Sequence, residues 1–134
     1  MRRSAELVLT RAEAVLAHDQ NNSGVAGYSA YALAALGEFE RAKARMERAL
    51  LIDPQNFNMR YNFACALSVY AKDKDAALDM LGPVFETVTD AFLPYVKADP
   101  DLELLRDDPR FQARLAATEA RLAAGSAKQA TPPT

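Results

Sequence analysis

Apolar residues recur at helical spacing along most of the chain. Within residues 38–52, Phe39, Ala42, Met46 and Ala49 follow steps of three and four residues and so share one helix face. Charged residues occupy most of the opposite face, as on a solvated helix. Similar patterns predict further helices, over 4–18, 25–36, 57–71 and from about 75 onward.

Residues at the ends of these segments are typical of helix boundaries. Asn22 and Ser23 can cap a helix start, Gly37 suits a left-handed helix end, and Asp53-Pro54 stops the helix before it. Asp99-Pro100 and Asp108-Pro109 each pair a capping aspartate with a proline in the first helical position. They predict a short helix over 100–106 and a longer one over 109–123.

The chain also repeats itself at an offset of 34 residues, the signature of a stacked-repeat architecture. The matching pairs are Leu16 and Leu50, Asp19 and Asp53, Asn22 and Asn56, Ala30 and Ala64, Ala32 and Ala66, Leu33 and Leu67, and Ala42 and Ala76. Ala30 with Ala42, and Ala64 with Ala76, stand where two helices of a hairpin would touch, and small side chains there let helix axes approach closely.

These features resemble the tetratricopeptide repeat (TPR), which has a 34-residue period, a small residue in each helix and a helix ending in Asp-Pro. The resemblance implies an all-α fold, a right-handed solenoid of helix hairpins with a C-terminal capping helix. The segments it implies are a helix of an incomplete preceding repeat (4–22), a TPR-like repeat (23–56), a divergent one (57–90), capping helices (91–123) and a disordered tail (124–134).

The chain departs from the family pattern in three ways. Ala26 and Arg60 stand where each first helix would have a bulky aromatic residue. Ala71 stands where the second repeat would have a glycine between its helices, and Gly82-Pro83 falls inside its closing helix. Proline lacks the backbone N–H and clashes with the preceding turn, so we expect a kink or break near 82–83.

The stretch from Tyr95 to Leu115 resembles the segment that closes TPR regions in bacterial multidomain proteins, including adenylate/guanylate cyclases. The leading expectation is therefore a non-catalytic interaction or assembly module, part of a larger bacterial protein. The alternative is a regulatory or dimerisation segment of a nucleotide cyclase, and a small-molecule or metal-binding helical domain is a third possibility.

In such solenoids the first helix of each pair lines a concave groove that takes a protein or peptide partner. The resemblance places the following groove candidates on that side: Tyr31, Tyr61, Asn62, Cys65 and Ser68. The two tyrosines would equally suit packing between helices. Gly27 and Tyr31 stand where a carboxylate-gripping groove needs lysine and asparagine, so we do not expect chaperone-tail binding.

Composition narrows the function classes. Alanine supplies 27 of the 134 residues, which favours helix. With a net charge of −2 and no evident basic face, we expect no nucleic-acid partner. No apolar run reaches the roughly 18 residues of a membrane span. The single cysteine and a start without an apolar leader favour a cytoplasmic protein.

Few residues offer chemistry, so we expect no enzyme, cofactor or metal. His18 is the only histidine and Cys65 the only cysteine. Asp99, Asp101 and Glu103 alternate like the first ligands of a calcium loop, but Leu104 and Arg110 stand where that loop needs glycine and a carboxylate. We interpret these acids as helix-capping residues, with the leucines between them buried.

The helix predicted over 4–18 has an apolar face that includes Leu7, Val8, Val15 and Leu16. Exposed apolar faces usually mark contacts. We therefore expect either that this helix mediates self-association or that the chain belongs to a longer one whose preceding helix covers this face.

Overall fold

The computed structural model describes residues 2–130, and every regular element in that part of the chain is helical. The elements are α1 (Arg2–Leu16), α2 (Ser23–Ala35), α3 (Phe39–Ile52), α4 (Phe57–Ala66), η1 (Leu67–Ala71, a π-helical turn), α5 (Lys74–Thr87), α6 (Leu93–Ala98), η2 (Pro100–Leu105, a 3-10 helix) and α7 (Pro109–Ala130). The all-α prediction is confirmed for these residues.

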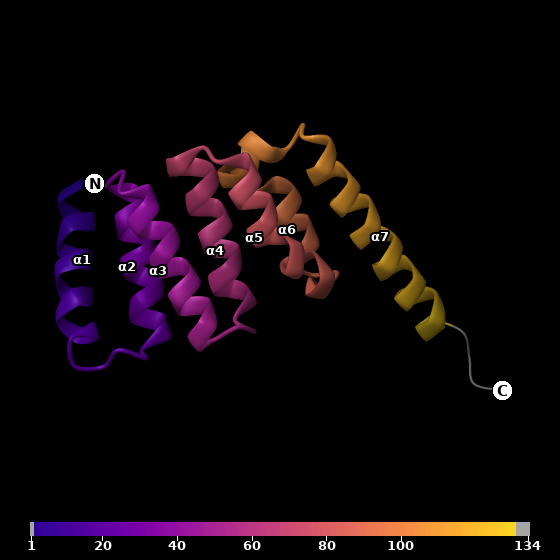
Figure 1. The fold of residues 1–134 in the computed structure, drawn as a ribbon. Coiled ribbons are helices and arrows are strands. Elements are labelled where there is room, and N and C mark those ends of the chain that lie inside the picture. The colour runs from indigo at the N-terminus through magenta and orange to yellow at the C-terminus, as the bar shows by residue number, and fades with distance from the viewer. Residues whose placement is uncertain (1, 131–134) are drawn as a thin grey trace.

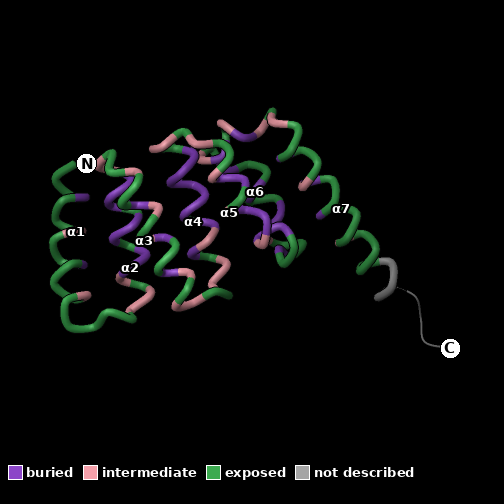
Figure 2. The backbone as a smooth tube through the Cα atoms, viewed as in Figure 1, coloured by how far each residue is buried: buried purple, intermediate pink, exposed green. Residues whose placement is uncertain are grey.

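The helices stand side by side and follow one another in chain order from α1 to α5, with α7 at the far end (Figure 1). Helix α2 contacts α1, α3 and α4, and α5 contacts α4 and α7. Buried residues concentrate along α2, α4 and α5, while α1 and α7 are largely exposed (Figure 2). None of the helices described is both long and apolar enough to cross a membrane.

Two turns with the same hydrogen bonds begin α2 and α4. Asn22 accepts the N–H of Val25 at 3.1 Å, and Asn56 accepts the N–H of Met59 at 3.0 Å. Each asparagine also donates to an aspartate three residues earlier, Asp19 or Asp53. The 34-residue repetition in sequence is therefore a repetition of local structure as well.

The repetition changes to 35 residues in the second helix of each pair. Helix α3 begins at Phe39 and α5 at Lys74, because the π-helical turn η1 holds one residue more than an α-helical turn would. The left-handed residue is accordingly Lys72, with φ of 53°, rather than Ala71. In the first pair it is Gly37, with φ of 83°.

This shift corrects the expected contact residue in α5. Ala77 is fully buried at the place that Ala42 occupies in α3, whereas Ala76 is only partly buried. Leu81 likewise takes the place of Met46. The 34-residue spacing in the sequence did not reveal the extra residue, because a π-helical turn has no characteristic sequence pattern.

We expected a kink or a break near 82–83, but helix α5 continues unbroken through Pro83 to Thr87, so the expectation of a break is wrong. Proline in a helix interior costs about 3 kcal/mol. The residues around it, Leu81, Val84 and Phe85, are at most 4% exposed. Burial of one such side chain contributes about 1.5–3 kcal/mol, so packing on both sides of the proline outweighs its cost.

The C-terminal segment packs onto α4 and α5 through buried apolar residues. Of the three leucines between the acids that we expected to be buried, Leu102 and Leu105 are fully buried and Leu104 is partly buried. Phe111 meets Phe85 edge-to-face at 5.7 Å. Helix α7 runs on to Ala130, so residues 124–130 are helical where we expected disorder. Three of these seven residues are alanine, the best helix former. The rest of the expected tail, 131–134, lies outside the described residues.

Candidate binding groove

A groove of about 770 Å³ is lined by residues from the start of α1, from α2 and from α4. Its walls consist of Ser4, Ala5 and Val8 from α1, Gly24, Gly27, Tyr28, Tyr31, Ala32 and Ala35 from α2, and Asn56, Asn58, Met59, Asn62 and Phe63 from α4 and its cap. Two of the predicted groove residues, Tyr31 and Asn62, are among them.

Glycine at position 27 lets the two central helices approach closely. A Cβ atom there would lie 3.2 Å from Sδ of Met59 and 3.7 Å from the ring of Phe63. These contacts would require Met59 to move by a few tenths of an ångström. The floor of the groove is therefore formed by tight packing between α2 and α4.

The rim offers hydroxyl and amide groups but no charge, since no acidic or basic residue lines the groove. The Tyr28 side chain is 70% exposed, more than that of any other tyrosine in the part of the chain that the structure describes. Asn58 and Asn62 stand one helical turn apart on α4 and are both exposed. An apolar floor with a neutral polar rim is typical of sites that bind peptide or helix segments.

Tyr28 and Asn58 line the groove but were not among the residues predicted from the sequence. Each lies one helical turn before a predicted residue, Tyr28 before Tyr31 and Asn58 before Asn62. Because residues three and four apart share a helix face, this spacing was the available signal.

Tyr31 joins the groove to the interior. Its ring meets that of Tyr70 edge-to-face, with 5.6 Å between centroids. Burial raises the pKa of the Tyr31 hydroxyl to about 12, and a hydrogen bond with Tyr70 adds to the shift. Tyr31 therefore remains a neutral donor and acceptor across the physiological range.

The other three predicted groove residues do not line it. Tyr61, Cys65 and Ser68 are 5%, 4% and 2% exposed. The segment from Phe92 through α6 and η2 covers them, since η2 packs on α4 and η1. The ring of Phe92 meets the Tyr61 ring edge-to-face, and the ring of Tyr95 lies tilted against it. The prediction failed because the helical pattern does not say that a later segment folds back over this face.

Beneath that segment lies a compact polar cluster. The Tyr61 hydroxyl donates to Oδ2 of Asp99 at 2.5 Å, and Oδ1 of Asp99 accepts the N–H of Asp101 at 2.9 Å. Sγ of Cys65 lies 3.9 Å from the same Oδ2. Burial raises the pKa of the Cys65 thiol to about 12 and that of Tyr61 well above its ordinary value, so both keep their protons.

Ligand atoms of Cys65, Asp99 and Asp101 all lie within 4.8 Å of one another, close enough to share a metal ion. A metal would need the thiolate form of Cys65, which burial opposes, and would displace the Tyr61 bond to Asp99. Burial and the neighbouring Asp99 also raise the pKa of Asp101. The arrangement is better suited to anchoring η2 on α4 than to coordination.

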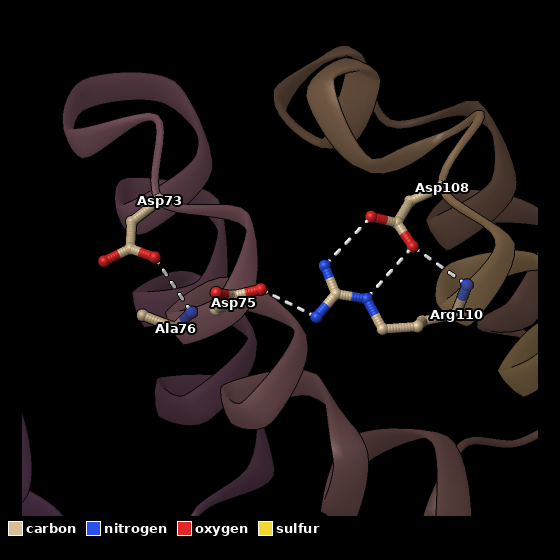
Figure 3. Close-up of polar contacts among 5 residues, drawn as sticks. All are labelled: Asp73, Asp75, Ala76, Asp108 and Arg110. Carbon is tan, nitrogen blue, oxygen red and sulfur yellow. Dashed lines mark hydrogen bonds and ion pairs between the residues drawn. The ribbon is translucent and has the colours of Figure 1, made fainter.

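Two of the five acids of residues 99–111, Asp99 and Asp108, act as helix caps, as their Asp-Pro sequences predicted. Asp99 caps η2, and Oδ1 of Asp108 accepts the N–H of Arg110 at 2.9 Å where α7 begins. The Arg110 guanidinium bonds both Asp108 and, at 2.7 Å, Asp75 of α5 (Figure 3). This exposed bridge ties the start of α7 to the start of α5.

No protein-family model, curated protein or solved structure matches this chain significantly. The functional interpretation consequently depends on the groove and on the repeated local structure.

Proposed function

We propose that this chain is a non-catalytic protein-interaction module of the TPR type, whose helix pairs stack as a right-handed solenoid. The groove formed by α1, α2 and α4 binds a segment of a partner protein. The repeated turns at Asn22 and Asn56 support this architecture, as do the close contacts between α2 and α3 and between α4 and α5.

The observation that carries the proposal is the uncharged groove of about 770 Å³ with Tyr28 largely exposed on its rim. Aromatic residues are enriched at protein interfaces because they bury much area at little entropic cost. A catalytic site would instead need a nucleophile with an activating base, an acid–base pair or a metal set. The groove lining holds the hydroxyls of Ser4, Tyr28 and Tyr31 but no histidine, cysteine, carboxylate or lysine beside them.

The test is selection of binding peptides from a random library on the purified chain, followed by calorimetry. We expect selected peptides to lose at least tenfold in affinity when Tyr28→Ala or Asn62→Ala is introduced. Leu51→Ala is the matched control, because Leu51 is 81% exposed and lies outside the groove. Failure to enrich any binder, or equal affinity for all three variants, would contradict the proposal.

The alternative, a regulatory segment of a bacterial nucleotide cyclase, depends only on the resemblance of residues 95–115. In either case we propose a cytoplasmic site of action. The support for it is chemical: Cys65, the only cysteine, is a buried free thiol that a reducing compartment would leave unchanged.

Helix α1 supports a second kind of contact, self-association. Leu7 is 51% exposed, and Val8 and Val15 are each 42% exposed. Association through these side chains would remove apolar area from water, which is the main driving force for such contacts.

A further inference from the structure

A second cavity, of about 420 Å³, lies between α1 and α3 and shares no residue with the groove. Three arginines of α3 line it, Arg41, Arg45 and Arg48, at helix spacings of four and three residues that put them on one face. Glu13 of α1 is the only acidic residue in its lining.

The middle arginine is fixed in place by two partners. Nη1 of Arg45 donates to Oε1 of Glu13 at 2.7 Å and to the hydroxyl of Ser29 at 2.8 Å. Ser29 is fully buried and in turn donates to the carbonyl of Ala26. Arg45 is thus held at the back of the cavity, and its charge is matched by that of Glu13.

The two outer arginines have no carboxylate partner of this kind. Arg41 and Arg48 are exposed, and neither forms an ion pair with any residue that the structure describes. With three guanidiniums against one carboxylate, the lining keeps two uncompensated positive charges, although the whole chain is net negative. The lining residues of this cavity are therefore net positive.

The guanidinium group binds phosphoryl oxygens through paired N–H donors, which makes arginine the usual residue for this recognition. Seven residues separate Arg41 from Arg48, about 10 Å along a helix, and long side chains on either side can converge on one ligand. A volume of about 420 Å³ lies within the range of small-molecule sites. We propose that this cavity binds a small ligand carrying two or more linked phosphoryl groups.

The probe for the test is inorganic tripolyphosphate, titrated calorimetrically into the full purified chain at 150 mM salt. We expect saturable binding at one site and a rise in Tm with ligand concentration. The double variant Arg41→Gln/Arg48→Gln should lose at least tenfold in affinity. Both residues are exposed, so the unliganded variant should keep the Tm of the parent chain.

The matched control is Arg3→Gln/Arg11→Gln, which removes the same charge from exposed positions of α1 outside the cavity. Its affinity should stay within twofold of the parent chain. Equal losses in the two double variants would mean diffuse charge attraction and would overturn the site. Absence of saturable binding, equally tight binding of citrate, or binding only of acidic peptides would overturn the assignment to a phosphoryl ligand.

Discussion

At the scale of single residues, the asparagines that begin α2 and α4 do the most for the local structure. Each accepts a backbone N–H of the first helical turn and donates to the aspartate three residues before it. An N-cap of this kind satisfies a donor that the helix itself leaves open. The same bonds at Asn22 and Asn56 set how the chain enters both first helices.

Replacement of Asn56 by alanine should lower the free energy of unfolding by about 1 kcal/mol, because the Met59 N–H loses its side-chain acceptor. Urea denaturation followed by circular dichroism measures the change. Asn56→Asp should retain most of the stability, since aspartate caps equally well. Asn58→Ala, at an exposed position nearby, is the control and should change stability by less than about 0.5 kcal/mol. Equal losses for Asn56→Ala and Asn58→Ala would contradict the capping role.

The ion pair between Lys43 of α3 and Asp73, the cap of α5, should make stability depend on pH. Nζ of Lys43 lies 2.7 Å from Oδ2 of Asp73. The Lys43 bond, together with the Ala76 N–H, lowers the pKa of Asp73, and the Asp73 bond raises the pKa of Lys43. Because the folded-state pKa of Asp73 is depressed, this stabilisation is complete above the ordinary aspartate value of about 3.9 and is lost as pH falls through the lower folded value.

The variant Asp73→Asn isolates this charge effect, because asparagine still caps the helix but carries no charge. We expect the variant to be less stable than the parent chain at pH 7, with the difference shrinking as the pH is lowered toward 2. Denaturation curves at several pH values measure it. A difference that stays constant over that range would show that the pair contributes nothing through charge.

At the scale of elements, the π-helical turn η1 is the feature that makes the second helix pair differ from the first. Its extra residue moves the left-handed position from the place of Ala71 to Lys72. It also turns α5 so that Ala77 and Leu81 face the core. The alanine of α5 that aligns with Ala42 at an offset of 34, Ala76, therefore lies one residue before Ala77, which takes its place in the structure.

Glycine substitutions should show which residue ends the first helix of the second pair in a left-handed conformation, Ala71 at an offset of 34 or Lys72 at an offset of 35. A left-handed conformation costs a residue with a side chain about 1–2 kcal/mol, so Lys72→Gly should stabilise the chain by about 1 kcal/mol. Ala71→Gly should destabilise it by about 0.5–1 kcal/mol, because Ala71 lies within η1 and gains only backbone freedom. Thermal unfolding measures both changes. Stabilisation by Ala71→Gly instead would mean that the 34-residue register holds throughout.

Local patterns predicted the elements but not the contacts between distant ones. Helix starts at Asn22, Asn56 and Asp108 follow from capping chemistry, which depends only on neighbours in sequence. Tyr31 and Asn62, which the family resemblance nominated, line the observed groove. Tyr61, Cys65 and Ser68 do not, because their burial depends on a segment some 30 residues further along.

At the scale of the whole molecule, the exposed apolar side chains of α1 predict self-association. The mean mass measured by sedimentation equilibrium should rise with concentration in the parent chain. Leu7→Glu/Val15→Glu should reduce that rise, because it puts two charges into the contact. Leu51→Glu is the control, since Leu51 is 81% exposed on α3 and should have little effect. A parent chain that remains monomeric up to high concentration would refute the prediction.

The chain also has two cavities of opposite character, the uncharged groove along α2 and α4 and the arginine-lined cavity between α1 and α3. Helix α2 contributes to the lining of both, through Gly27 and Tyr28 on one side and Ala26 on the other. Because the two cavities have no lining residue in common, residue-specific signals can follow the occupation of each cavity separately.

The most direct test of the central claim is to map, by NMR chemical-shift changes, where a library-selected peptide binds on the isotope-labelled chain. We expect changes that saturate together and cluster at Tyr28, Tyr31, Asn58 and Asn62. Changes centred on Arg41 and Arg48, or on the exposed face of α1, would contradict the proposal that this groove is the partner-binding site.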